Sequence, residues 1–519
     1  MQSENVQNRL IFICTILYLI GYWFFTFDGI TFSDDVVYME FGRAFWAGET
    51  FPYKTHFADR WGAYIFSGFF THFFDFNERT ASFASLLSYL LSYSLLFSLL
   101  QSPKEKLIFS LLYLGQVYFL YFIHKVYPDS ILLVFICLIV WSAIKRNEHP
   151  VFTGFCMSIA FLLGFITKET IVFLLPFPLI LFGYDWKNRT SIKFYYAFFS
   201  ASILLLISYF GYYQLNHGNW MYRFTAVNEG HYISDFTYHD KGWIAILKRL
   251  TYLPFQTFIE RSYWPYIVTA TVLIVNGNKS SKQTFKIIAL TSFCLLLGFW
   301  FMSSTLEFYN PIYLNPRHLI ILVPLLSWII ATSSDKLFQN KGINRLIAVS
   351  FLIAAMLSWN SFDLMVYYGA LALLLIGVEY FSMAKWLFIP FILLPSVVSG
   401  HYHYQNKNYA HMKQTYQSFA NSNHSNIKLA NSFLVYSNSV LLAEADRNKV
   451  LFLGNWKESV STTPPIIEVF IYKFYKHAYP LEQNDWDHLQ EWLIKENYKA
   501  NQVYDDQWIE IWRFENQVP

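Results

Sequence analysis

Long runs of apolar residues alternate with short polar segments over the first 400 residues of the chain. The first run, LIFICTILYLIGYWFFTF (Leu10 to Phe27), approaches the roughly 20 residues that a helix needs to cross a bilayer core. No small-residue cleavage site follows it and Asp28 comes next, so the run predicts an uncleaved span rather than a signal peptide. The same pattern predicts about thirteen transmembrane helices, near 9–27, 81–100, 107–124, 130–144, 151–167, 170–184, 194–213, 263–276, 286–303, 318–332, 344–359, 363–381 and 384–399.

Lysine and arginine residues gather in every second short loop between these runs. Loops on the cytoplasmic side carry an excess of these residues, so the pattern predicts the orientation of the chain. With the N-terminus inside, the inward loops hold Lys104, Lys106, Lys145, Arg146, Lys187, Arg189, Lys193, Lys279, Lys282, Lys286, Lys336, Lys341 and Arg345. The opposite loops, including the long segments 28–80 and 214–262, then face the periplasm, the cell exterior or the ER lumen. The lack of ER-retrieval signals and of lumenal cysteine pairs favours a bacterial inner membrane.

The pattern changes near residue 400, where the sequence becomes polar and no later run is long enough to span a membrane. VLFLGNW (450–456) and QWIEIWRF (507–514) alternate like strands, and DWDHLQEWLIKEN (485–497) has helical spacing. We therefore expect an all-α polytopic membrane domain over 1–400 and a small extracytoplasmic α/β domain over 401–519.

The composition supports a membrane protein and limits the chemistry. Hydrophobic residues make up 55% of the chain and charged residues only 14%, against about a quarter in soluble domains. The net charge of +3 does not indicate nucleic-acid binding, because the basic residues lie mostly in short loops. The four cysteines lie in apolar runs, without metal-ligand spacing, and are expected to be packing residues. No Gly-rich phosphate loop, HExxH, CxxC or nucleophile elbow occurs, so cytosolic nucleotide chemistry has no support.

Two adjacent aspartates, Asp34 and Asp35, follow the first span. After them, VVYMEFGRAFWAGE has helical periodicity and predicts an amphipathic helix in the membrane interface, with Val37, Phe41, Ala44 and Phe45 on its apolar side. The aspartates suit a general base or ligands for a divalent metal ion such as Mg²⁺, Mn²⁺ or Zn²⁺. The alternative is that Ser33 or Asp34 only caps the helix.

Charged residues also stand at the ends of three outward-facing apolar runs. They are Arg60, the neighbours Lys168 and Glu169, and the neighbours Arg317 and His318. A basic residue at this depth could hold a lipid-linked phosphate, or it could anchor the helix at the membrane surface. Lys168 and Glu169 could instead form a surface pair with each other, and Asp59 could pair with Arg60. His56, His231 and His239 are expected to be ordinary polar loop residues.

These features resemble the GT-C glycosyltransferases. The likeness is to the protein O-mannosyltransferases and the bacterial aminoarabinose transferase of lipid A. An acidic pair, a tyrosine and an alanine-bearing helix are matched by Asp34, Asp35, Tyr38 and Ala44. Arg60-Trp61-Gly62 stands where that family has a Lys-Pro-Pro-like motif, which is a departure. FITKETIVFLLP and NPRHLIILVP are similar to its Thr-Lys and Arg-His segments.

The resemblance implies an enzyme that transfers a hexosyl or pentosyl group from a polyprenyl-phosphate-linked donor to a protein, lipid or glycan, with inversion. It implies that Asp34 or Asp35 acts as base or binds a metal, and that Arg60, Lys168 and Arg317 hold the donor phosphate, with Tyr38, Glu169 and His318 in support. The alternative is a transporter or lipid flippase without transferase activity. Such proteins usually show inverted repeats and charges at the midplane, which this sequence does not show.

Overall fold

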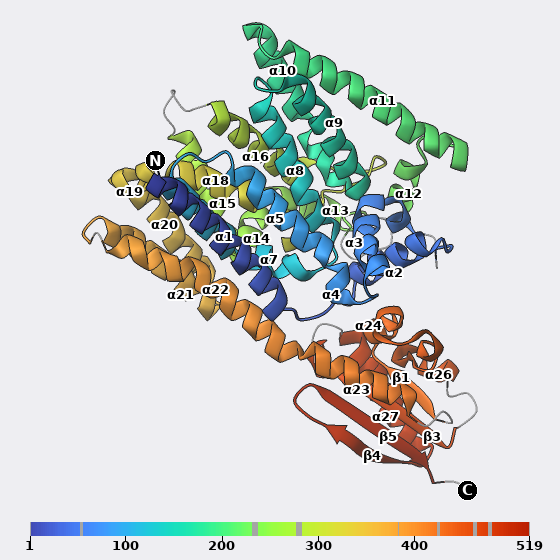
Figure 1. Cartoon of the computed structure of the whole chain (residues 1–519). Coiled ribbons are helices and arrows are strands. Elements are labelled where there is room, and N and C mark those ends of the chain that lie inside the picture. The colour runs from blue at the N-terminus through green and yellow to red at the C-terminus, as the bar shows by residue number, and fades with distance from the viewer. Residues whose placement is uncertain are drawn as a thin grey trace. The chain divides into compact units, whose positions relative to one another are not determined.

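The computed structural model describes residues 2–51, 55–230, 237–276, 283–381, 383–422, 426–459, 464–475 and 480–517. Helices make up most of the chain, and a five-stranded sheet lies near its C-terminal end (Figure 1). The chain forms two compact units: residues 1–23, 53–66 and 83–398, and residues 24–52, 67–82 and 399–519. The predicted fold class, a helical membrane domain followed by a small α/β domain, is confirmed.

The first unit is built from helices. Its helices, three of which (α1, α3 and α22) run into the second unit, are α1 (Gln2–Phe25), α3 (Trp61–Phe73), α5 (Phe83–Phe97), α6 (Pro103–Gly115), α7 (Val117–Tyr121), α8 (Pro128–Lys145), α9 (Pro150–Thr167), α10 (Pro176–Asn188), α11 (Ile192–His217), α12 (Tyr222–Gly230), α13 (Gly242–Thr251), α14 (Leu253–Glu260), α15 (Trp264–Val275), α16 (Gln283–Phe301), α17 (Pro316–Leu319), α18 (Val323–Thr332), α19 (Ser334–Gln339), α20 (Lys341–Leu357), α21 (Phe362–Val378) and α22 (Ala384–Lys407). Short 3₁₀ turns join some of them: η1 (His56–Asp59), η2 (Phe122–His124), η3 (Glu169–Leu174) and η4 (Ile320–Leu322).

Eight of the described helices are long and apolar enough to cross a membrane, and a bent pair makes a ninth. The count of thirteen from the sequence is not confirmed, although shorter apolar helices lie at 264–275, 316–332 and 362–378. The bent pair is the run predicted as one span at 107–124. It breaks by 70° between α6 and α7, because Gln116 leaves the helical conformation and its side chain caps the backbone N–H of Phe119.

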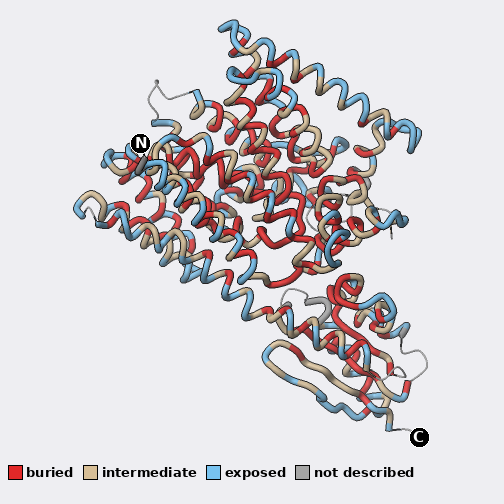
Figure 2. The backbone as a smooth tube through the Cα atoms, in the orientation of Figure 1, coloured by how far each residue is buried: buried red, intermediate tan, exposed pale blue. Residues whose placement is uncertain are grey.

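Burial in the first unit follows the pattern expected of a helical bundle in lipid. Helix α8 is mostly buried and packs against α5, α9 and α16. In contrast, much of α11 is exposed, as its pale colour in Figure 2 shows, and its exposed residues include the apolar Ile203 and Leu204. Apolar side chains on the outer face suit a hydrocarbon environment, where every backbone polar group is already bonded within its helix.

The C-terminal part of the second unit is a mixed sheet in the order β2-β1-β3-β5-β4. Its strands are β1 (Ile427–Ala430), β2 (Leu451–Phe452), β3 (Ile466–Tyr472), β4 (Tyr498–Asp505) and β5 (Ile509–Asn516); β1 is parallel to β2 and β3, and β5 is antiparallel to β3 and β4. One face packs on α27 (Pro480–Lys495) through Leu489 and Leu493. Phe470 of β3 contacts Tyr416 and Phe419 of α23 (Tyr409–Asn421).

The predicted C-terminal elements are largely found. The helix predicted at 485–497 overlaps α27, which ends two residues earlier at Lys495, and the strand predicted at 507–514 corresponds to β5. The strand predicted at 450–456 is shorter, because it ends at Phe452 and the chain turns into η6 (Leu453–Asn455). Gly454 lies against the Phe452 ring at this turn, and a larger residue there would require the ring to move. The short helices α24 (Ser432–Val435), α25 (Asn438–Leu441) and α26 (Trp456–Ser459), with η5 (Glu444–Asp446) and η7 (Lys473–Tyr475), complete the C-terminal part.

The segment after α1 belongs to the second unit rather than to a linear membrane domain ending at residue 400. Asp28 forms a buried ion pair with Lys407 (2.9 Å), and Gly29, at φ +78°, lies directly against the ring of Tyr409. In α4 (Glu78–Ala81), Glu78 accepts hydrogen bonds from Tyr409 and Lys413. These contacts attach the loop that carries the acidic pair to the C-terminal residues.

Helix α2 (Asp34–Ala47) confirms the amphipathic helix predicted after the acidic pair, but with a different buried side. Phe41 and Ala44 are buried as expected, whereas Phe45 is exposed. Helix α3 approaches α2 closely at Gly68, which lies against the backbone of Gly42 and admits no side chain there.

Arg146 and Asp185 form the most deeply buried ion pair of the first unit's described residues. Arg146 Nε and Nη2 donate to the two oxygens of Asp185, at 2.6 and 2.9 Å. The hydroxyl of Tyr195 also donates to Asp185 at 2.6 Å, and Arg146 Nη1 donates to a backbone carbonyl. The pair therefore ties α8, α10 and α11 together. Every hydrogen bond of the Asp185 carboxylate is made inside the protein.

We expect Asp185→Asn to destabilise the protein by about 3 kcal/mol, because it leaves Arg146 buried without its counter-charge. The measurement is thermal unfolding of the purified protein in detergent. Glu148→Gln is the matched control, since the Lys145–Glu148 pair is largely exposed and its loss should cost under about 1 kcal/mol. Equal stability of the two variants would contradict the structural role of Asp185.

Candidate active site

A cluster of charged residues lies where several elements of the first unit begin or end. Arg60 follows η1, Lys168 and Glu169 join α9 to η3, and Arg317 lies in α17. These are the ends that the charge pattern predicts to face outward. Two residues not selected from the sequence, Asp129 in the first turn of α8 and Arg223 in α12, complete the cluster.

Glu169 holds two arginines. Arg60 donates from Nε to both carboxylate oxygens, at 3.3 and 3.2 Å, and its Nη2 lies 3.0 Å from Oε2. Arg223 donates from Nη2 to Oε1 at 2.9 Å. Both arginines are buried, while Glu169 is partly exposed. Arginine can meet two oxygens at once in this way because its guanidinium is a planar fork.

Gly62 lets this arrangement form. The start of α3 packs so closely on the end of α9 that a Cβ at Gly62 would lie 2.0 Å from the Thr167 hydroxyl. Glycine therefore permits the contact that brings Arg60 to Glu169. Close packing thus requires the glycine of the Arg60-Trp61-Gly62 sequence. This sequence lacks the prolines of the Lys-Pro-Pro-like motif that it replaces.

Asp129 lies close to the other two basic residues predicted from the sequence, Lys168 and Arg317. Lys168 Nζ donates to its Oδ1 at 2.6 Å, and Arg317 Nε lies 4.0 Å from its Oδ2. The Arg317 guanidinium also lies 4.7 Å from the centre of the Tyr127 ring. Burial lowers the pKa of Lys168 to about 8; the carboxylate of Asp129 opposes this effect, and the positive charges of Arg317 and Arg60 add to it. Lys168 and Glu169 therefore pair with different partners rather than with each other.

Positive charge exceeds negative charge in the cluster. Arg60, Lys168, Arg223 and Arg317 face the carboxylates of Asp129, Glu169 and Asp59, which leaves a net charge of +1 when all are ionised. The Asp59 carboxylate accepts a hydrogen bond from Tyr213 at 2.9 Å, while Arg60 has its ion pair with Glu169. Burial raises the pKa of Asp59, against the effects of the Tyr213 hydroxyl and the Arg223 charge. Any protonation of Asp59 makes the cluster more positive.

The partly exposed members, Glu169 and Arg317, mark the side from which a ligand can approach. Within the cluster, Oδ2 of Asp129 and Nε of Arg223 are buried and have no hydrogen-bond partner among the described residues. Such atoms are uncommon in native proteins. A buried, net positive group of fixed guanidinium and ammonium donors is suited to a phosphate or other oxyanion.

The acidic pair lies in the second unit, and the structure separates its two members. Asp35 is 1% exposed, and its carboxylate accepts backbone N–H groups from Thr31 at 2.6 Å, Ser33 at 3.1 Å and Val36 at 3.2 Å. Asp34 is partly exposed at the first position of α2. Asp35 therefore organises the backbone, while Asp34 is the member that an external group can reach.

Phe32 shows why the loop needs Asp35. Its φ of +56° lies in the left-handed region, which costs a non-glycine residue on the order of 1–2 kcal/mol. The two N–H groups that flank it, on Thr31 and Ser33, both donate to Asp35. The Phe32 ring packs against Phe433 and Tyr472 of the C-terminal part. These contacts hold the unusual conformation directly before Asp34.

The other sequence candidates take supporting positions. Tyr38 is fully buried in α2, and His318 is buried with Nδ1 3.0 Å from the carbonyl oxygen of Tyr313. His239 is paired with Asp240, and His231 falls outside the described residues. No group of three or more His, Cys, Asp or Glu side chains with metal-binding geometry occurs in the described part of the chain. Both carboxylate oxygens of Asp35 accept backbone N–H groups.

Comparison with known proteins bears on the fold. No protein-family model matches this sequence, and no curated protein sequence matches it either. Two crystal structures of ArnT from Cupriavidus metallidurans do match. The one bound to undecaprenyl phosphate has a TM-score of 0.59 at 14% identity, and the apo state has a TM-score of 0.56 at 12% identity. Each match covers 96% of this chain and 97% of the other.

The chain has the ArnT fold. This confirms the GT-C resemblance inferred from the motifs as a likeness of fold, and it extends that resemblance over the C-terminal domain, which the motifs did not cover. Four members of the charged cluster were predicted from the sequence: Arg60, Lys168, Glu169 and Arg317. The other two, Asp129 and Arg223, were not. Asp129 follows a proline at a helix start, where an acidic residue is ordinary. Arg223 lies in the long segment 214–262 with several other charges, so nothing in the pattern singles it out.

We expect Asp35→Asn to lower the stability of the purified protein by about 2 kcal/mol, because an amide cannot accept all three charge-assisted bonds. Asp34→Asn should change it by less than about 0.5 kcal/mol, as is usual for substitutions away from buried contacts. Thermal unfolding in detergent compares the two variants. A larger loss in Asp34→Asn than in Asp35→Asn would overturn this division.

Proposed function

We propose that this protein is an integral membrane glycosyltransferase that moves a sugar from a polyprenyl-phosphate-linked donor to an acceptor at the outer, periplasmic face of a bacterial inner membrane. The observation that carries the proposal is the net positive cluster around Asp129 and Glu169. A comparison supports the proposal, because an ArnT structure of the same fold is bound to undecaprenyl phosphate.

The cation cluster is proposed to hold the donor phosphate. When the bond between the anomeric carbon and the phosphate oxygen breaks, the electron pair stays on the phosphate, which leaves as polyprenyl phosphate. Arg60, Lys168 and Arg317 would stabilise the negative charge that grows on that oxygen. Because their carboxylate partners already fix them in place, little reorganisation is needed during the reaction.

Asp34 is proposed to act as the general base. It would take the proton from the acceptor hydroxyl as the acceptor oxygen attacks the anomeric carbon, and attack opposite the leaving phosphate inverts that carbon. Asp35 would set the position of Asp34 through the backbone of residues 31–36. No step of the proposal passes through a metal ion. The transferred group is a hexosyl or pentosyl sugar, and the acceptor is a protein, a lipid or a glycan.

The first test is Asp34→Asn. We expect it to reduce sugar transfer in membranes by at least about 100-fold, the usual lower range for loss of a general base, without changing the binding of polyprenyl phosphate. The assay follows radiolabelled sugar from lipid-linked donors into membrane acceptors, and a chelator is added in a parallel sample. Full activity of Asp34→Asn would refute the assignment of the base, and loss of activity on chelation would point to a metal instead.

The same preparation addresses the alternative of a flippase or transporter. Purified protein in liposomes that moves lipid-linked sugar across the bilayer, with no transfer to any acceptor, would favour that alternative. The charged cluster lies at helix ends rather than at mid-helix positions, which counts against it.

The second test is the pH dependence of donor binding. Lys168 has a pKa of about 8, so it is charged below that pH and becomes neutral above it. We expect the affinity for polyprenyl phosphate to fall as the pH rises through about 8, by up to about tenfold per pH unit. Asp129→Asn should move this decline to lower pH, because Asp129 raises the pKa of Lys168.

Lys168→Met is the control for this measurement. It should bind the lipid more weakly at neutral pH and show no decline near pH 8. A decline that persists unchanged in Lys168→Met would show that another group titrates.

A further inference from the structure

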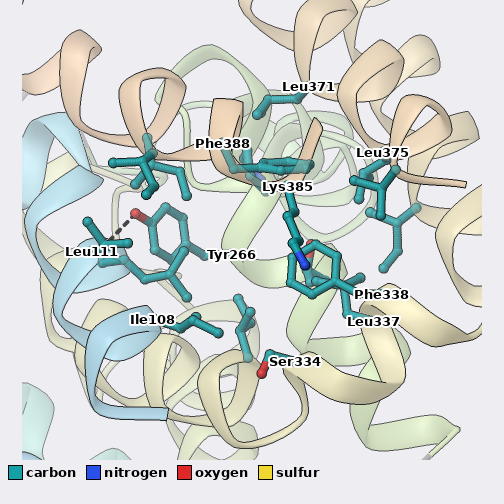
Figure 3. A pocket seen from close by; sticks show the side chains of 18 of the residues that line it. Ile108, Leu111, Tyr266, Ser334, Leu337, Phe338, Leu371, Leu375, Lys385 and Phe388 are labelled. Atoms are coloured by element: carbon teal, nitrogen blue, oxygen red, sulfur yellow. Dashed lines mark hydrogen bonds between the residues drawn. The ribbon is translucent and has the colours of Figure 1, made fainter. Parts of the chain in front are cut away.

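A cavity of about 700 Å³ lies in the first unit, away from the charged cluster. It is lined by residues of α6, α15, α18, α19, α20, α21 and α22. Figure 3 shows many of the lining side chains from close by. Its volume falls within the roughly 300–1,000 Å³ typical of small-molecule sites. The cluster described above uses none of these lining residues.

The interior of this cavity is apolar. Side chains such as Leu111, Phe338, Leu371 and Phe388 line it (Figure 3). The hydroxyl of Tyr266 is already bonded to the carbonyl oxygen of Leu112 at 2.8 Å. A hydrocarbon chain therefore fits the interior better than a polar ligand, which would lose its hydrogen bonds to water there.

The rim of the cavity carries charge. Lys104 and Asp335 form an exposed ion pair at the start of α6 and α19. Lys385 near the start of α22 is exposed, its side chain points into the cavity in Figure 3, and it has no carboxylate partner among the described residues. The rim thus has one positive charge in excess, beside an apolar interior.

The rim lies on the side that the Lys and Arg pattern predicts to be cytoplasmic. Along α6 the lining runs from Lys104 to Leu112, which at 1.5 Å per residue is about 12 Å. That depth is close to half of a hydrocarbon core of about 30 Å. The cavity therefore matches one leaflet, with its apolar end near the midplane and its charged rim at the headgroups.

We propose that this cavity binds an anionic phospholipid of the cytoplasmic leaflet, with an acyl chain inside and the phosphate at Lys385. The excess positive charge at the rim favours an anionic headgroup over a zwitterionic one. This site is separate from the donor site, because its rim lies at the opposite ends of the helices. The inference does not depend on the proposed transferase activity.

The test measures lipid binding by the full-length protein in detergent, using native mass spectrometry with phosphatidylglycerol or phosphatidylcholine. Phosphatidylglycerol should bind more tightly, and Lys385→Gln should weaken it about fivefold, the effect of one lysine near anionic lipid. Binding of phosphatidylcholine should not change in this variant. Lys341→Gln is the matched control, because Lys341 is an exposed lysine on the same side that does not line the cavity.

A second variant tests the apolar interior. Leu111→Trp fills part of the cavity and should reduce the binding of both lipids, while thermal unfolding verifies that the protein is folded. Equal binding of the two lipids by the unaltered protein, or an equal effect of Lys385→Gln and Lys341→Gln, overturns the proposal. Undiminished lipid binding by folded Leu111→Trp overturns it as well.

Discussion

The need to neutralise charge inside a low-dielectric environment governs the design of this protein. A buried ion that loses its partner costs several kcal/mol, so each buried cation must have a carboxylate, or another fixed acceptor, close by. Asp129 serves Lys168 and Arg317, Glu169 serves Arg60 and Arg223, and Asp185 serves Arg146. These pairs join elements far apart in the sequence and thereby fix where the helix ends of the first unit meet.

The same constraint explains how a binding site can form from a structural network. In the Arg146–Asp185 pair the charges balance and every carboxylate oxygen is used, so the pair only holds helices together. Around Asp129 and Glu169 there are more cations than the carboxylates require, and Glu169 and Arg317 are partly exposed. The carboxylates position the cations, and the excess charge is what an incoming phosphate would neutralise.

In the second unit a comparable division separates two neighbouring aspartates. Asp35 gives its oxygens to backbone N–H groups and stabilises the left-handed Phe32, while Asp34 remains accessible on the first turn of α2. The loop that presents them is attached to the C-terminal residues through Asp28–Lys407 and the Phe32 ring contacts. The C-terminal domain thus supports the conformation of this loop, a role its own sequence does not suggest.

The sequence alone determined the membrane class, the approximate helix positions, the small α/β domain and most cations of the candidate site. These follow from local properties: apolar run length, periodicity, and charges placed at the ends of runs. The tertiary structure decided which charges meet. Asp129 looks like an ordinary helix start, Arg223 is one charge among several in its segment, and Asp34 and Asp35 look equivalent as neighbours. Their roles depend on distant partners, 109 residues away for Arg60 and Glu169 and 164 for Arg223 and the carbonyl oxygen of Asp59, and on burial, which no local pattern records.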